Sequence, residues 1–265
     1  TTPGQLTDYA IEVTAPGRVS FDVVEATDNI NNMRAELIAE DGTTVFAQYL
    51  GQDLRFFRGE VMPGRYTLRF YGYEDEIGSA RIALRTDASA TPLTRDVEVA
   101  GTLDTPQALK LWSLDAVAGD RVTLDFDAFE GRTVGSLSLR VFAPDGTQMQ
   151  SIGFTGQDVF FDPPRDGRYI ITLDAPPGQA DPITYRFTAR TAPLTETALT
   201  VGTRVDGSFT VPFSRNVHTF SLAEETTLYF NALTSSPAQL SLFTATGEAP
   251  AQGPISDFDR FYNGG

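Results

Sequence analysis

The sequence predicts an all-β protein made of tandem β-sandwich domains of jelly-roll type. Short runs of alternating apolar and polar residues follow one another along the chain, and turns rich in glycine or proline separate them. The whole pattern repeats after about 100 residues, and no segment carries a sustained helical stripe. Such alternation is typical of strands buried on one face, and about 100 residues is a usual size for one sandwich.

The turns show the repeat most clearly. An Asp-Gly-Thr turn at residues 41–43 returns at 145–147, and a weaker Thr-Gly-Glu turn occupies 246–248. A Gly-Arg-Tyr hairpin at 64–66 returns at 167–169. Because glycine accepts a positive φ, these positions fit tight turns between strands. The same turns in the same order indicate copies of one structural unit.

Two junctions separate the copies. Pro-Leu-Thr at 92–94, followed by Gly-Thr at 101–102, returns at 193–195 and 202–203. Each junction is expected to open a new copy, and the third copy stops before its Gly-Arg-Tyr hairpin, so it is C-terminally incomplete relative to the second. The predicted domains are residues 1–88, 89–192 and 193–265.

Two core strands can be followed through all three copies. Their apolar residues alternate with polar ones and keep the same register, so we expect them to face the interior of each sandwich. They are Val19, Phe21 and Val23 with Val122, Leu124 and Phe126 and with Leu228, Phe230 and Ala232 in one strand, and Met33, Ala35 and Leu37 with Leu137, Leu139 and Val141 and with Ala238, Leu240 and Leu242 in the other.

The composition excludes several classes of function. With 35 acidic and 20 basic residues the net charge is −15, so phosphate backbones and anionic lipid surfaces would repel the chain. The absence of cysteine removes disulfides, thiolate nucleophiles and sulfur-ligated metal sites. The single histidine excludes a multi-histidine metal site within one chain. The negative charge leads us to expect no nucleic acid as a partner. No apolar run approaches the roughly 18 residues of a membrane span, so we expect no membrane insertion.

In the second repeat a series of motifs appears in a fixed order: Gly101-Thr102, Trp112-Ser113-Leu114, Ala118-Gly119, Leu137-Ser138-Leu139, Asp145-Gly146 and Gly167-Arg168-Tyr169. This series resembles the bacterial pre-peptidase C-terminal (PPC) domain, which is found on secreted peptidases and large surface proteins. The resemblance covers nearly the whole chain. It implies a non-catalytic, exported module, and some members of the family bind calcium while others bind collagen or polysaccharide.

Two acidic groups are candidate calcium sites. Glu74, Asp75 and Glu76 fall in one turn, where several oxygens from a flexible loop would suit a hard cation. Asp125, Asp127 and Glu130 lie on and just after a predicted strand, and Asp22 and Glu25 occupy the corresponding region of the first repeat. Solvent-facing alternation is the competing interpretation of both groups. We expect no cofactor other than this possible calcium.

The aromatic residues are expected to be structural. One position of the aligned repeats is occupied by Tyr9, Trp112 and His218 in turn. Each of these residues is therefore predicted to lie on a strand and to pack on a sheet face. Phe56-Phe57 and Phe160-Phe161 are adjacent pairs, so one ring of each pair must point outward. The outward ring is expected to cover an inter-domain contact, with a ligand patch as the alternative. No serine has a motif that would activate it as a nucleophile.

The sequence therefore predicts a non-catalytic structural or adhesive segment of a secreted or cell-surface bacterial protein. Its partners would be neighbouring domains of the same chain or array. Three alternatives stay open: a module that binds glycan or a matrix protein, an accessory domain of a secreted peptidase, and a subunit of a fibre assembled by strand donation.

Overall fold

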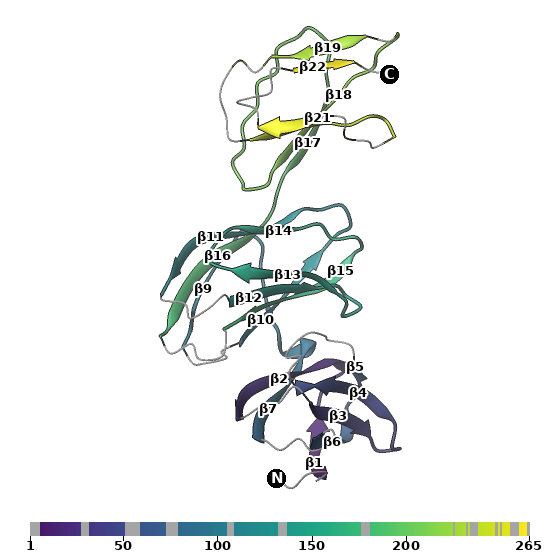
Figure 1. Cartoon of the computed structure of the whole chain (residues 1–265), viewed down its shortest axis with the longest axis vertical. Coiled ribbons are helices and arrows are strands. Elements are labelled where there is room, and N and C mark those ends of the chain that lie inside the picture. Colours follow the sequence, from purple (N-terminus) through teal and green to yellow (C-terminus); the bar gives the residue numbers. More distant parts are fainter. Residues whose placement is uncertain are drawn as a thin grey trace. The chain divides into compact units, whose positions relative to one another are not determined.

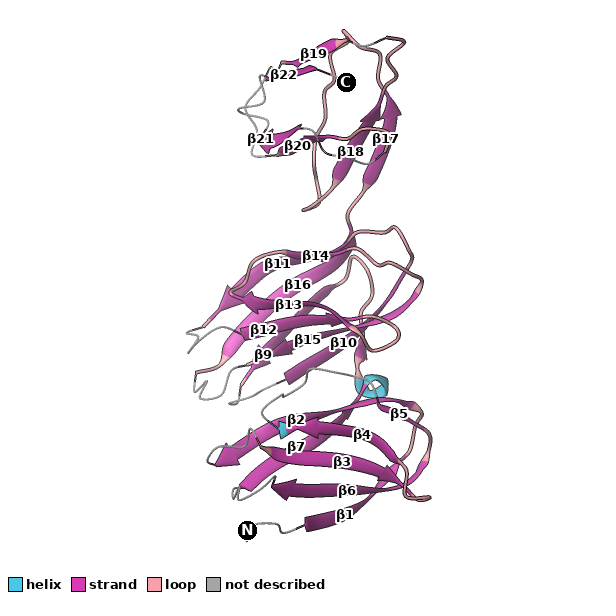
Figure 2. Cartoon of the chain, turned by 45° about the vertical axis from the view of Figure 1, so that its right-hand side comes forward, coloured by secondary structure: helices cyan, strands magenta, loops and turns pink. Residues whose placement is uncertain are grey.

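The computed structural model describes residues 6–27, 32–50, 59–72, 79–104, 109–131, 137–175, 181–224, 226–231, 233, 238–246, 249, 251–254 and 260–263. Within these residues the regular structure consists almost entirely of strands, and the short 3₁₀ helix η2 spans Asp87–Ser89 (Figure 2). The fold class is all-β, as the alternation predicted. No helix in the described part of the chain is long and apolar enough to cross a membrane.

The first sandwich consists of two antiparallel sheets (Figure 1). One sheet has the order β1-β6-β3-β4 and the other β5-β2-β7. The residues predicted to face the interior on β2 and β3 are buried between them. The strands are β1 (Leu6–Val13), β2 (Gly17–Thr27), β3 (Met33–Ala39), β4 (Thr44–Tyr49), β5 (Gly59–Val61), β6 (Gly64–Gly72) and β7 (Ser79–Thr86).

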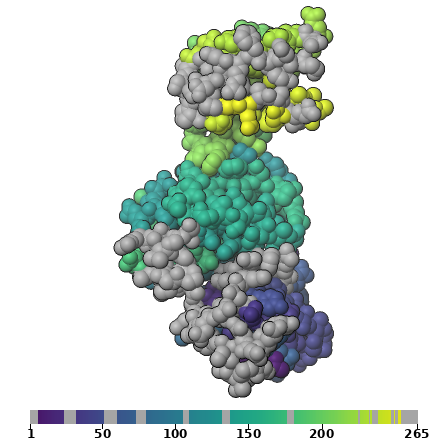
Figure 3. All heavy atoms as spheres, in the orientation of Figure 1, coloured from purple at the N-terminus to yellow at the C-terminus, as the bar shows by residue number. Residues whose placement is uncertain are grey.

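The second sandwich repeats this arrangement with two more strands. Its sheets have the orders β13-β12-β15-β10-β8 and β14-β11-β16-β9, and in the space-filling view its residues, in teal, form a closely packed surface (Figure 3). Its strands are β8 (Thr91–Pro92), β9 (Glu98–Leu103), β10 (Leu109–Ala116), β11 (Val122–Glu130), β12 (Leu137–Phe142), β13 (Gln148–Phe154), β14 (Val159–Phe161), β15 (Gly167–Asp174) and β16 (Ile183–Thr191).

Irregular features recur at equivalent places in the two sandwiches. The β2–β7 ladder shifts register between Val23 and Glu25, and the β11–β16 ladder shifts between Phe126 and Ala128. The Tyr66 hydroxyl donates to the Met62 carbonyl at 2.9 Å, and the corresponding Tyr169 hydroxyl donates to the Arg165 carbonyl at 2.7 Å. Since bulges and such local hydrogen bonds depend on particular residues, their recurrence shows that the two sandwiches share one internal construction.

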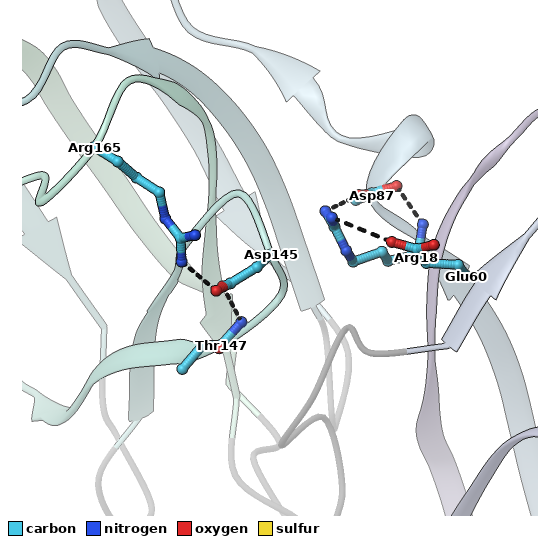
Figure 4. A network of polar contacts seen from close by, with 6 residues as sticks. All are labelled: Arg18, Glu60, Asp87, Asp145, Thr147 and Arg165. Atoms are coloured by element: carbon cyan, nitrogen blue, oxygen red, sulfur yellow. Dashed lines mark hydrogen bonds and ion pairs between the residues drawn. The ribbon is translucent and has the colours of Figure 1, made fainter.

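The Asp-Gly-Thr turns also match in detail. The Thr43 amide donates to the Asp41 carboxylate at 2.9 Å, and the Thr147 amide donates to the Asp145 carboxylate at the same distance. The turn glycines have φ of 87° and 79°. In the second sandwich Arg165 also pairs with Asp145, so that carboxylate receives both a backbone and a guanidinium donor (Figure 4). These contacts fix the hairpin that joins β12 to β13.

The rest of the chain forms a second compact unit, which comprises Thr195–Gly207 and Asn216–Gly265. The described strands that lie wholly or largely in this unit pair two by two as β17-β18, β19-β22 and β20-β21. Leu228 is the one apolar side chain that is buried among the residues described in this unit. Thr1–Leu194 and Ser208–Arg215 belong to the first unit. The strands are β17 (Leu194–Ala198), β18 (Arg215–Thr219), β19 (Thr227–Phe230), β20 (Gln239–Leu242), β21 (Ala251–Pro254) and β22 (Arg260–Asn263).

The boundaries predicted at residues 88 and 192 stay predictions. Each of the first two repeats nevertheless has a hydrophobic cluster of its own, drawn from residues 13–68 in one case and 93–189 in the other.

Candidate docking face

The outer face of β2 in the first sandwich carries polar residues that are fully buried. Val19, Phe21 and Val23 point into the core, so Ser20 and Asp22 lie on the opposite side of the strand. An outer face with this alternation would normally meet solvent, yet Ser20 and Asp22 are 0% exposed. Other parts of the molecule must therefore cover this face.

Asp22 is held there by an arginine on the neighbouring strand. Arg85 of β7 donates to Asp22 Oδ2 from Nε at 2.8 Å, and its Nη2 lies 2.7 Å from the same oxygen. Burial raises the pKa of Asp22 because it disfavours the charged carboxylate, and the Arg85 guanidinium opposes this effect. The pair is a partly buried ion pair whose partners come from two strands of one sheet.

The junction between the two sandwiches is ordered at its first residues. The backbone N–H of Arg18 on β2 donates to Asp87 Oδ1 at 2.8 Å, and the Arg18 side chain reaches both Asp87 and Glu60 (Figure 4). Asp87 belongs to η2, the short helix that follows β7. The start of the junction is thus tied to the sheet that carries the buried Asp22.

The following junction residues dock on the second sandwich. Ala90 is buried in a small apolar cluster with Phe142 and Ile170, which lie on β12 and β15. Thr91 and Pro92 form β8, which pairs in parallel with β10. Residues 87–92 therefore contact both sandwiches. A flexible linker would make no such ordered contacts.

The second sandwich also contains a largely buried ion pair. Arg140 Nη1 is 3.4 Å from Asp174 Oδ2 at the end of β15. Burial raises the pKa of Asp174 to about 6; the Arg140 guanidinium counters this, and the negative charge of Asp22 adds to it.

The equivalent face of the second sandwich is covered by a later segment. Thr123 of β11 is buried, and its hydroxyl donates to the Pro212 carbonyl at 3.2 Å. The Phe160 ring of β14 packs on the Phe213 ring with centroids 4.5 Å apart. The Arg121 guanidinium lies 4.3 Å from the Phe160 centroid. The outward ring of this phenylalanine pair thus contacts a residue of the third predicted repeat, whereas Phe56 and Phe57 lie outside the described residues.

The aspartate–arginine pair also recurs on this second face. Arg190 Nε of β16 donates to Asp125 Oδ2 at 3.0 Å, as Arg85 does to Asp22. We call the outer surface of β2, β5 and β7, and the equivalent surface of β11, β14 and β16, the docking face of each sandwich. In both sandwiches residues that follow in the sequence contact this face.

The predicted calcium ligands are not gathered into a metal site in the described residues. No group of three or more His, Cys, Asp or Glu side chains comes together there. Asp125 pairs with Arg190, and Asp127 falls at the bulge between Phe126 and Ala128. Glu130 is the last residue of β11. Glu74, Asp75 and Glu76 lie outside the described residues, so the prediction for that turn is unaffected.

The recurring arginine was the signal that sequence reasoning missed. Asp22 and Asp125 were grouped with other carboxylates as a possible cation site. The cation beside each of them is a guanidinium, from Arg85 and Arg190 respectively. Both arginines stand near the end of the last strand of their repeat, and this shared position could have identified them.

The position that Tyr9, Trp112 and His218 share in the aligned repeats holds a buried tryptophan in the second sandwich. Trp112 is opposite Ile171 in the β10–β15 ladder, as Tyr9 is opposite Leu68 in the β1–β6 ladder. Trp112 packs edge-on against Tyr185 and Phe187 of the facing sheet, with centroids 5.6 Å and 5.1 Å away. Its role there is core packing. His218 is half-buried on β18.

No protein-family model matches the chain, and no curated protein matches it. Among solved structures it is similar to Aeromonas hydrophila PliG, a periplasmic inhibitor of g-type lysozyme. The identity is 16%, the match covers 38% of this chain and 96% of PliG, and the TM-score is 0.30. It is also similar to the CUB1-EGF-CUB2 segment of human MASP-1/3, with 10% identity, 72% and 94% coverage and a TM-score of 0.27. Similarity at this level assigns no family.

Proposed function

We propose that the chain is a non-catalytic structural segment in which each β-sandwich presents its docking face to the residues that follow it. One observation carries the proposal: in two successive repeats a later part of the chain contacts the same outer sheet face. Asp87 contacts Arg18 in the first repeat, and Pro212 and Phe213 contact Thr123 and Phe160 in the second. Such docking restricts the angles between neighbouring domains, which suits a spacer that projects another domain.

The rest of the proposal rests on the sequence. The chain has no cysteine and one histidine, and no serine carries an activating motif, which supports a non-catalytic role. We place the segment outside a bacterial cell or on its surface because its motifs resemble PPC domains. Adhesion to a glycan or matrix protein belongs to the same proposal as an additional activity.

The ordered junction can be tested by measuring a distance between the first two sandwiches. Because the chain lacks native cysteine, spin labels can be attached at Thr44→Cys and Val117→Cys, two exposed positions in different sandwiches. We expect a narrow distance distribution in electron–electron double resonance. A charge at the buried Ala90 would disrupt the apolar cluster, so Ala90→Asp should broaden the distribution.

The matched control is Ala88→Asp, which adds the same charge at an exposed position of the same junction. This variant should keep the narrow distribution. A wild-type distribution as broad as that of Ala90→Asp would show a flexible tether and would contradict the spacer function.

A further inference from the structure

A short segment of the third predicted repeat belongs to the first compact unit. The chain leaves this unit after Leu194, returns to it at Ser208 and leaves it again after Arg215. We call residues 208–215 the strap. The strap forms part of the connection between β17 and β18, and it also contacts the second sandwich. It is therefore more than a loop that joins two strands.

The strap is held on the docking face of the second sandwich by a small set of contacts. The Thr123 hydroxyl donates to the Pro212 carbonyl at 3.2 Å. The Phe213 ring packs on the Phe160 ring with centroids 4.5 Å apart. Thr123 is fully buried, whereas Phe213 remains 38% exposed. The strap thus covers part of the docking face while much of its own surface stays in solvent.

The turn that makes these contacts has a strained backbone. Phe213 has a φ of 61°, which lies in the left-handed region that residues other than glycine rarely adopt. Ser214 closes the turn, because its N–H and its hydroxyl both donate to the Val211 carbonyl, at 3.3 Å and 2.6 Å. A strained residue of this kind persists only where surrounding contacts hold it. The contacts with Thr123 and Phe160 supply that support.

The strain and the contacts are of similar size. A left-handed residue other than glycine costs about as much free energy as one aromatic contact or one neutral hydrogen bond contributes. The docked strap is therefore only slightly favoured over a released one. Thr123 and Phe160 are not part of the core cluster of the second sandwich, so the strap can open without disturbing that core.

The first docking face is bound in a different way. Asp87, which directly follows β7, accepts a hydrogen bond from the Arg18 N–H, and Ala90 is buried in an apolar cluster. None of residues 87–92 has a positive φ. The contacts of the first junction are thus made without the backbone strain that the strap carries at Phe213.

We propose that the strap is a releasable contact: it limits bending of the chain beyond the second sandwich when it is docked, and it permits bending when it is released. In the released state Phe213 leaves the left-handed region, and Thr123 and Phe160 become exposed to solvent. This inference rests on the proposed spacer function, and it adds the place at which the spacer bends most readily.

Hydrogen exchange on the full chain measures release of the strap directly. We expect residues 208–215 to exchange at least about tenfold faster than residues 87–93, because opening the strap breaks few contacts. Two variants weaken docking and are called the docking variants. Thr123→Val removes the hydroxyl that donates to the strap, and Phe160→Ala removes the ring on which the strap packs. Each should speed exchange of the strap about fivefold.

The matched control is Phe209→Ala. It removes a phenylalanine ring from the same strap at a position that is 47% exposed, so the exchange rate of the strap should not change. Both docking variants alter side chains outside the core cluster and should keep the fold, which circular dichroism melting verifies.

The effect on bending is measured with a second pair of spin labels. Val117→Cys is exposed on the second sandwich, and Ala223→Cys is exposed beyond β18. In electron–electron double resonance the docking variants should broaden this distance distribution, and Phe209→Ala should not. The distribution between Thr44→Cys and Val117→Cys should stay unchanged in all three variants, because neither label lies on or beyond the strap.

Two results would overturn the inference: exchange of the strap as slow as that of residues 87–93, or exchange that neither docking variant accelerates. Equal broadening by Phe209→Ala would also overturn it, since the ring contact would then be irrelevant. A broad distribution between Thr44→Cys and Val117→Cys in an otherwise wild-type chain would contradict the spacer function alone. The release of the strap would then stand or fall on its exchange rates.

Discussion

Lowering the pH from 7 to 5 should stabilise the unit that contains the two sandwiches, and Asp174 is the group that causes this. Its carboxyl is mostly buried, and its pKa is about 6 in the folded chain against 3.8 when unperturbed. The folded state therefore binds the proton more tightly than the unfolded state. The stabilisation is present at low pH and is lost as the pH rises through 6.

The size of the effect follows from the two pKa values. Between pH 7 and pH 5 the folded carboxyl becomes largely protonated while the unfolded one stays largely ionised, which gives about 1 kcal/mol of added stability. The pKa of Asp22 is also raised, so it contributes with the same sign. The pKa of Asp145 is lowered to about 2, mainly by the Thr147 amide, so its contribution is lost only below pH 4.

Thermal melting of the full chain at pH 5 and pH 7 would measure this difference. A change of about 1 kcal/mol corresponds to roughly 2–4 °C for a unit of this size. The Asp174→Asn variant cannot ionise, so its melting temperature should depend less on pH over this range. If the variant kept the full pH dependence, or if the wild type lost stability on acidification to pH 5, the assignment to Asp174 would be refuted.

Three further predictions concern packing and the candidate cation site. Urea denaturation should show that Trp112→Ala costs about 3–5 kcal/mol, whereas Tyr9→Ala costs under about 1 kcal/mol because that side chain is half exposed; equal costs would contradict the comparison. Gly101→Ala should destabilise by about 1–3 kcal/mol, and a double-mutant cycle should show that the penalty disappears in a Tyr185→Ala background. Asp125→Ala should lower the melting temperature by the same amount with and without millimolar calcium, since an arginine already pairs with the carboxylate. A calcium-dependent difference would place a metal there.

Much of the fold could be predicted from local pattern. Val19, Phe21 and Val23 alternate with polar residues along the sequence. A strand with one buried face places these apolar side chains in the core and the polar ones on the opposite side. The Asp-Gly turns fixed the ends of the strands. The register shift at Val23 could not be predicted, because a bulge changes the alternation by a single residue, a change within the ordinary variation of such patterns.

The candidate site was less accessible to sequence reasoning. Asp22 and Asp125 were identified as members of a candidate cation site. Their actual partners, Arg85 and Arg190, are more than 60 residues away in the chain. Only the pairing of β2 with β7 and of β11 with β16 brings those side chains together. Grouping carboxylates by their nearness in sequence therefore suggested a metal site where the structure has an ion pair.

By itself, the sequence determined the strand-forming pattern, the inward-facing apolar residues and the repeat period, because these depend on local alternation and on turn chemistry. Only the tertiary structure decided which outer faces are buried. Ser20 and Thr123 have the polar character of solvent-facing residues, and nothing local distinguishes them from exposed ones. The contacts made there join residues far apart in the chain: the Thr123 hydroxyl donates to the Pro212 carbonyl, and Arg18, two residues before Ser20, donates to Asp87.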